Sequence, residues 1–290
     1  MGAAMRAGGL AVVVAGILAG CDSQVGIEGS DYHRDDSPSA TTRSATAAAS
    51  ASPAASAPMI DSPVTVALVT ADAQATDAVG RWAADLQRLT PAELEAKCWT
   101  MAPRNVDTMY ADKSAILSAL AQPGSDNGTA LVWKSASAAA DPVTVVAERA
   151  DIATGYACPR VHPAGTEVGF GTSSEAQTAD ARHIVRRYLA RTSGHPLEAA
   201  DQESTHPLLC TTDTAWDPSG AGRTARAPLA TNPNKLPDPT AFSDQSLSST
   251  ALNSTYLSIT ATVTAGGSQQ ERTYTVKATD QGYCIGDVSA

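Results

Sequence analysis

Four cysteines constrain the fold of this chain more than any other feature. Cys98, Cys158, Cys210 and Cys284 follow the first third of the sequence, and no two of them form a C-x-x-C motif. Structural zinc sites and thioredoxin-like redox sites use such close spacing, whereas an even number of widely spaced cysteines is typical of disulfides in exported proteins. The four cysteines allow three pairings, and their number alone does not choose among them.

The N-terminus supplies the export signal that disulfides require. Residues 7–20 are all small or aliphatic, and Arg6 is the only charge before them. A membrane-spanning helix needs about 20 apolar residues, so this shorter run is typical of a signal peptide. The run ends in the sequence LAGC at residues 18–21, which resembles the lipobox of bacterial lipoproteins. The alternative is an ordinary secretory signal followed by an incidental cysteine.

The lipobox resemblance implies a definite cellular location. Residues 1–20 would be removed as the lipoprotein signal peptide, and the thiol of Cys21 would carry a diacylglycerol, with palmitate-type chains. Two or more acyl chains anchor a protein stably, whereas one does so only marginally. We therefore expect a cell-envelope protein, anchored to the cell membrane by lipid and facing outside the cytoplasm.

A low-complexity segment follows the predicted anchor. From Ser37 to Pro58 every residue except Arg43 is Ser, Pro, Ala or Thr. Side chains this small bury too little apolar surface to offset the entropy of ordering the backbone. We expect residues 21–62 to form a disordered tether.

Helical periodicity precedes the first cysteine. A two-helix pattern starts with one apolar face over residues 75–89, and Thr90-Pro91-Ala92-Glu93 then has the form of a capping box with proline at the first helical position. A short second helix is therefore expected just before Cys98. The residues of the first apolar face are Ala75, Ala78, Val79, Trp82, Leu86 and Leu89.

A similar order recurs before the third cysteine. Thr172 and Glu175 form another possible capping box, an apolar helical face runs over residues 181–189, and His195-Pro196 is expected to begin a short helix before Cys210. The segments TGYACPRV, at residues 154–161, and QGYCIGDV, at residues 281–288, then each place a cysteine just after Gly-Tyr.

This repetition favours one pairing and one architecture. We predict an α+β fold of two tandem helix-plus-antiparallel-sheet units, residues 63–168 and 169–290, each closed by its own disulfide. The pairs would be Cys98–Cys158 and Cys210–Cys284. The alternative is a single larger domain in which the similarity arose by chance.

The strand signals are clearest near the C-terminus. Alternating apolar residues over 257–263 and 274–278 flank Gly266-Gly267, which predicts a hairpin, and GYCIGDV supplies a third strand. Helices followed by antiparallel strands, the last with a cysteine, resemble the cystatin-like and nuclear-transport-factor-two-like domains of actinobacterial lipoproteins. The proline-rich stretch 216–244 departs from that pattern, as either a functional insertion or a misread element.

Composition and motifs indicate no reaction. The formal net charge of −10 argues against nucleic-acid binding. The nucleophile motifs G-x-S-x-G and S-x-x-K are absent, and the spacing of His195 and His206 matches no metal-binding pattern. We therefore expect no catalytic residues, no metal site and no cofactor. His183 lies among arginines and is expected on a solvated basic face.

The resulting expectation is a non-catalytic binding or assembly module of the cell envelope, with an envelope protein as partner. Trp216 opens the proline-rich stretch and is the candidate binding residue, as an exposed aromatic anchor. Trp82 is expected in the core, and Trp99 is expected to pack on the disulfide beside it. Two alternatives remain: a binder of a small apolar ligand or lipid in a concave sheet pocket, and an isomerase-like enzyme with a buried acid.

Overall fold

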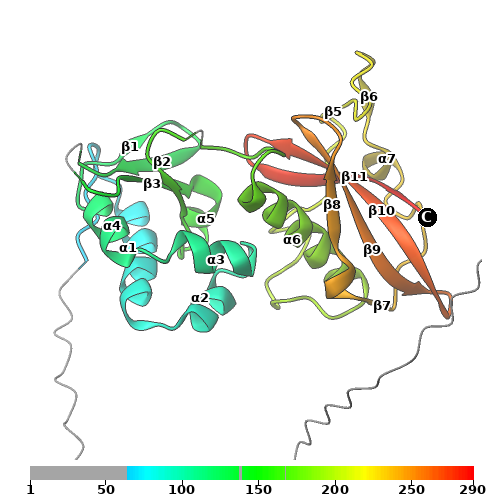
Figure 1. The fold of residues 1–290 in the computed structure, drawn as a ribbon, viewed down its shortest axis with the longest axis horizontal. Coiled ribbons are helices and arrows are strands. Elements are labelled where there is room, and N and C mark those ends of the chain that lie inside the picture. Colours follow the sequence, from blue (N-terminus) through cyan, green and yellow to red (C-terminus); the bar gives the residue numbers. More distant parts are fainter. Residues whose placement is uncertain (1–63, 137–138, 167) are drawn as a thin grey trace, which may run out of the picture. The chain divides into compact units, whose positions relative to one another are not determined.

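The computed structural model describes residues 64–136, 139–166 and 168–290. These residues belong to one compact unit, Met59–Ala290. The predicted signal peptide and the whole predicted tether, with Cys21, lie outside the described residues. Helices combine with antiparallel sheets, which confirms the α+β class (Figure 1).

The N-terminal half begins with helices whose first residues are capped by side chains. The Asp72 carboxylate accepts a hydrogen bond from the Ala75 amide, and Thr90 and Glu93 form the predicted capping box. Asp112 caps a further helix that the sequence analysis did not foresee. The helices are α1 (Ala73–Arg88), α2 (Pro91–Lys97), α3 (Pro103–Met109) and α4 (Lys113–Leu120).

A four-stranded antiparallel sheet completes this half, with the strands in chain order and a short helix between the last two. Alternate residues such as Trp133 and Val145 point toward the helices, because successive side chains of a strand face opposite sides. The elements are β1 (Ser125–Asp126), β2 (Ala130–Lys134), β3 (Val143–Glu148), α5 (Arg149–Ala153) and β4 (Arg160–Pro163).

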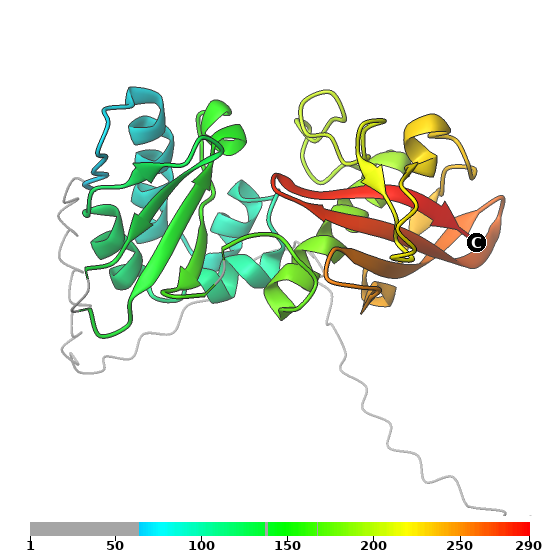
Figure 2. The same cartoon turned by 90° about the horizontal axis from the view of Figure 1, so that it is seen from above.

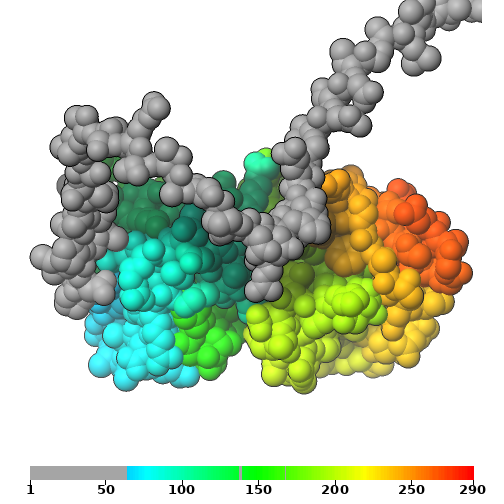
Figure 3. Space-filling view, turned by 90° about the horizontal axis from the view of Figure 1, so that it is seen from below, coloured from blue at the N-terminus to red at the C-terminus, as the bar shows by residue number. Residues whose placement is uncertain are grey.

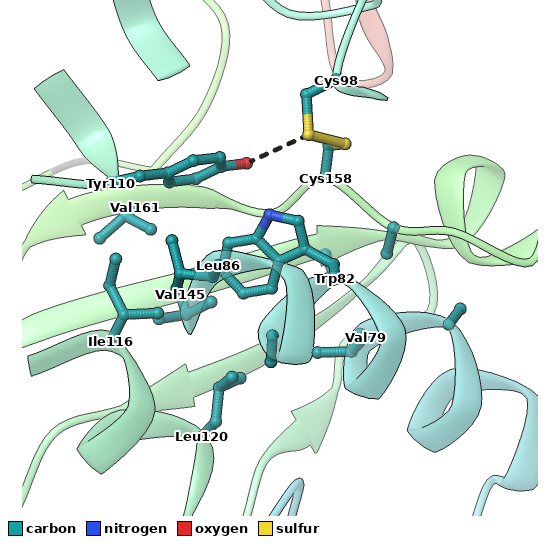
Figure 4. Packing of buried hydrophobic residues seen from close by; sticks show 14 of the residues in the cluster. Val79, Trp82, Leu86, Cys98, Tyr110, Ile116, Leu120, Val145, Cys158 and Val161 are labelled. Carbon is teal, nitrogen blue, oxygen red and sulfur yellow. Dashed lines mark hydrogen bonds between the residues drawn. A yellow bond between two sulfur atoms is a disulfide. The ribbon is translucent and has the colours of Figure 1, made fainter. Parts of the chain in front are cut away.

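The core of this half lies between the helices and one face of the sheet. Trp82 of α1 is fully buried, as expected, and its ring meets the Tyr110 ring edge-on at 5.0 Å between centroids. The Tyr110 hydroxyl donates to the Pro159 carbonyl at 2.9 Å. Figure 4 shows the Cys98–Cys158 disulfide directly beside these two rings. The disulfide is therefore part of this core.

The C-terminal half has one long helix, α6 (Glu175–Thr192), and a sheet in the order β11-β10-β9-β7, with β8 also paired to β9. The predicted hairpin is confirmed, with Gly266 and Gly267 at φ values of 59° and 79° in its turn. Figure 2 shows its strands in orange and red beside the final strand. The strands are β7 (Ala241–Phe242), β8 (Ser248–Ala251), β9 (Tyr256–Ala265), β10 (Ser268–Thr279) and β11 (Gly282–Ser289).

The proline-rich stretch contains short strands and helices and is therefore not a structureless loop. A small two-stranded sheet forms within it, and Leu229 of the following helix is buried in the second core. Its elements are β5 (Ala215–Trp216), β6 (Ala225–Arg226), α7 (Pro228–Thr231) and the 3₁₀ helix η1 (Asp244–Ser246), with β7 before η1.

Trp216 is not an exposed anchor, so that expectation is wrong. Its side chain is buried at 5% exposure and packs edge-on against Tyr256, with 5.1 Å between ring centroids. The same small cluster contains Cys210, which is bonded to Cys284. Trp216 therefore fills the face of the second sheet that α6 leaves uncovered.

Two local predictions in this half were wrong. The cap of α6 is Ser174 with Gln177, two residues beyond the expected Thr172 and Glu175. The segment after His195 is not helical. Figure 3 shows part of this yellow-green segment at the molecular surface. Arg187 and Arg191 hold the segment through ion pairs with the buried Asp201 carboxylate.

Each half thus has its own sheet and its own hydrophobic cluster. Each also has its own disulfide, with the pairing that the sequence repetition favoured, Cys98–Cys158 and Cys210–Cys284. Separate domains at 63–168 and 169–290, and their origin by duplication, stay predictions.

Candidate functional site

A cleft of about 850 Å³ lies over the face of the first sheet that points away from its helices. Strand alternation dictates its floor, because Trp133 and Val145 face the core and their neighbours must face the other way. Val132 and Val146 provide the apolar part of this floor, and Glu148 lies at the end of β3. The floor thus combines aliphatic and ionisable groups.

The walls of the cleft come from segments far apart in the sequence. Asp151 lies in α5, directly after the strand that ends in Glu148. Asp180 and Ile184 lie one turn apart on α6. The walls also include Phe170, from the segment before α6, and Tyr283, at the start of β11.

Arg160 of β4 is the central cation of the cleft. Its Nη1 donates to the Asp180 carboxylate, and its Nε lies 3.7 Å from a Glu148 oxygen. Its guanidinium carbon lies 4.5 Å from the centroid of the Phe170 ring, within the range of a cation–π contact. Burial alone would lower the pKa of Arg160, but Asp180, Glu148 and Asp151 outweigh burial and raise it. Arg160 therefore stays charged.

Asp180 fixes the position of Arg160 and also joins the two halves of the compact unit. Its side chain is 5% exposed, and besides the bond from Arg160 it accepts a hydrogen bond from the Ala102 amide at 3.1 Å. Beside it, the Asn105 side-chain amide donates to the Ala176 carbonyl at 2.8 Å. These bonds attach the start of α3 to the first turns of α6.

Two acids of the cleft have pKa values close to neutrality. Burial raises the pKa of Glu148 to about 7, and the charges of Asp151 and Asp180 add to this effect while Arg160 opposes it. Burial also raises the pKa of Asp151 to about 6, although Arg160 again lowers it. Carboxyl groups with such pKa values exchange protons readily near pH 7.

A buried ion cluster borders the cleft at Arg187. Arg187 donates to the Asp201 carboxylate at 2.7 Å, and the Asp201 side chain has no exposed surface. The Arg187 guanidinium also lies 4.9 Å from the Trp99 ring centroid, and His206 meets that ring edge-on at 4.8 Å. The Trp99 ring was expected to pack on the neighbouring disulfide. Its cationic partner is Arg187 and its aromatic partner is His206.

The expectation of a solvated basic face around His183 is wrong. His183 is buried, its Nε2 lies 2.7 Å from the Trp99 carbonyl oxygen, and burial lowers its pKa to about 4. Arg187 is also buried, while Arg182 donates to the Ser249 hydroxyl and Arg186 pairs with Asp244. Arg182 and Arg186 thus each have a partner within the fold.

Sequence reasoning missed the cleft. Trp216 does not line it, and of the four cysteines only Cys158 does. Its ionisable residues form no short motif, because Glu148, Arg160 and Asp180 come from two strands and a helix. The one available signal was the mixed second face of the first sheet, where Thr144 and Glu148 of β3 flank Val146.

Within the described ranges, no group of three or more His, Cys, Asp or Glu side chains could hold a metal ion. None of the helices there is long and apolar enough to cross a membrane. No family model, curated protein or solved structure matches this chain.

Proposed function

We propose that this protein is a lipid-anchored lipoprotein of the cell envelope that binds a small ligand in the cleft over its first sheet. The cleft itself is the observation that supports this proposal. Its volume of about 850 Å³ falls within the range of about 300–1,000 Å³ typical of small-molecule sites. Such sites combine an apolar lining with a few convergent polar groups, as Val132 and Val146 do here with Glu148 and Arg160.

The surface favours a small ligand over the assembly module expected from the sequence. The proposed anchor for an envelope protein, Trp216, is buried. The exposed large hydrophobic residues of the described ranges are Val69, Val168 and Leu252, which lie far apart in the sequence and belong to different segments. Single exposed apolar residues are normal on a protein surface and do not indicate a docking patch.

A volume-filling substitution tests the ligand proposal. Val132→Trp would place a large ring in the cleft without touching the helical core, because Val132 points away from Trp133 and its neighbours. We expect native mass spectrometry of the wild-type protein, purified from its own envelope, to show a bound small molecule that Val132→Trp lacks. Val69→Trp, at a site 70% exposed and outside the cleft lining, is the control. A wild-type protein without any bound molecule contradicts the proposal.

The anchor is tested separately at Cys21. Cys21→Ser would prevent acylation, so we expect this variant to leave the membrane fraction and to take up no labelled fatty acid. The wild type should do the opposite. A Cys21→Ser protein that remains membrane-bound contradicts the lipoprotein assignment without affecting the cleft.

One observation favours a second candidate, an acid–base enzyme of the isomerase type. A general base works best with a pKa near the working pH, and the pKa of Glu148 is about 7. The two candidates differ in what Glu148→Gln does. In a binding protein, both the wild type and Glu148→Gln release the captured molecule chemically unaltered. In an enzyme, the wild type converts this molecule and Glu148→Gln does not.

A further inference from the structure

We infer that the ligand of the cleft is a small organic cation, an ammonium or guanidinium group attached to an apolar body. This inference rests on the proposed function, since it names the chemical class that the same cleft would bind. It follows from the charges on the walls of the cleft together with the apolar surface beside them.

The charges around Arg160 do not balance. Three carboxylates, those of Glu148, Asp151 and Asp180, act on this one guanidinium. Asp180 takes its direct hydrogen bond, and the Phe170 ring lies against it. At 3.7 Å, Glu148 is beyond ordinary hydrogen-bond distance from Arg160.

The other cations that line the cleft cannot complete the balance. Arg187 already donates two hydrogen bonds to Asp201 and stacks on Trp99, and Arg149 pairs with Asp72 and Asp126. Lys134 lies opposite Thr144, four residues along β3 from Glu148. Glu148 and Asp151 therefore share only part of one positive charge. A cationic group entering from the cleft would supply the positive charge that these two acids lack, whereas their ionised forms would repel a carboxylate or phosphate.

The apolar surface determines the rest of the ligand. Val132 and Val146 provide aliphatic area on the sheet, and Ile184 faces the same cleft from α6. An apolar body would cover these side chains while its charged end meets Glu148. Burial keeps part of the acid population protonated near neutral pH, and a bound cation would favour the ionised form.

The test compares three probes with one ring system and different charge: 2-naphthylmethylammonium, 2-naphthylmethanol and 2-naphthylacetate. Binding is measured by calorimetry on the full chain in lipid nanodiscs, with empty nanodiscs as the blank. We expect the dissociation constant of the ammonium probe to be lower than that of the alcohol by at least about tenfold, because the ammonium group can form a charge-assisted hydrogen bond. The acetate should bind most weakly.

Variants connect this preference to the cleft. Glu148→Gln, which keeps the shape of the side chain, should reduce the preference for the ammonium probe, and Asp151→Asn should do so independently. Asp77→Asn removes the same charge from an exposed site on α1 outside the cleft and should leave the preference unchanged. Val132→Trp should abolish binding of all three probes.

The outcomes separate this inference from the proposed function. If the alcohol or the acetate binds as tightly as the ammonium probe, and Val132→Trp abolishes this binding, the cleft remains a ligand site but the cationic class is wrong. If no probe binds, or if Val132→Trp binds them like the wild type, both proposals fail. A preference that survives both acid variants also overturns the inference.

Discussion

Arg160 and Glu148 lie on neighbouring parts of one sheet face, with 3.7 Å between the Arg160 Nε and a Glu148 carboxylate oxygen. The distance is short enough for attraction and too long for a good hydrogen bond. Arg160 is held by Asp180 instead, so Glu148 is half-buried without full neutralisation. Burial, which Arg160 opposes only in part, raises the pKa of Glu148 to about 7.

The stability of the protein should therefore depend on pH through Glu148. Its ordinary pKa is 4.5 and its folded pKa is about 7, so between these values the folded protein holds a proton that the unfolded chain has lost. Through this group, rising pH lowers the free energy of unfolding. The free energy of unfolding of Glu148→Gln, relative to that of the wild type, should thus rise by about 1–3 kcal/mol from about pH 5 to about pH 8.

Urea denaturation of both proteins across this pH range measures the difference. Asp151, with a pKa of about 6, acts in the same direction and is present in both proteins, as are Arg160 and Asp180. Asp77→Asn on exposed α1 is the charge control. A difference between Glu148→Gln and wild type that stays constant with pH would show that Glu148 titrates normally.

Loss of the Asp180 carboxylate should be strongly destabilising. Asp180→Ala would leave the partly buried Arg160 without its closest partner and the buried Ala102 amide without its acceptor. Breaking a buried ion pair in this way costs about 3–5 kcal/mol. Asp244→Ala is the matched control, since Asp244 pairs with Arg186 at a site 47% exposed and should cost about 1 kcal/mol or less. Equal losses for the two variants, measured by thermal unfolding, would contradict the role given to Asp180.

Local signals in the sequence predicted the parts of the fold that depend on neighbouring residues. The Thr90 capping box and the Gly266-Gly267 hairpin are set by residues within a few positions of one another. The helix expected at His195 failed for the opposite reason. Arg187 and Arg191 bind Asp201 there, and no local pattern contains ion pairs across ten or more residues.

The cleft could not be predicted for a related reason. The second face of the first sheet mixes valines with polar residues, and Thr144 and Glu148 on it look like solvent-facing residues in the sequence. Their burial depends on α6 and on the segment around Phe170, which lie across the cleft. The prediction for Trp216 had the opposite error, because this residue was expected at the surface and instead packs in the interior against Tyr256.

The place of Trp216 leads to a prediction at Gly286. A Cβ atom at Gly286 would lie 2.1 Å from the Trp216 ring, which no real contact allows. Gly286→Ala should therefore displace the ring and cost about 1–3 kcal/mol, as overpacking does. Gly80→Ala is the control, because a Cβ there meets nothing within 4 Å and the α1 backbone accepts alanine.

Thermal unfolding and tryptophan fluorescence check both glycine variants. Gly80→Ala should raise the stability by about 0.5–1 kcal/mol, since alanine is the better helix former. Gly286→Ala should lower the stability and change the emission of the indole. An unchanged spectrum with full stability would mean that Trp216 does not occupy its buried position.

The two disulfides should stabilise the protein separately. They close loops with sequence separations of 60 and 74 residues, for which chain entropy predicts about 4 kcal/mol each. Each bond belongs to a different cluster, one with Trp82 and Tyr110 and the other with Trp216. Two double variants remove one disulfide each: Cys98→Ala with Cys158→Ala, and Cys210→Ala with Cys284→Ala. Each double variant should have a lower melting temperature than the wild type. The effects should add in the quadruple variant, because distant and independent sites are additive.

Hydrogen exchange then decides between one cooperative unit and two. If loss of Cys98–Cys158 increases exchange in α1 and β3 but not in β9 and β10, the halves unfold independently, as the predicted domains require. Equal increases in both sheets would show that 63–168 and 169–290 form a single domain.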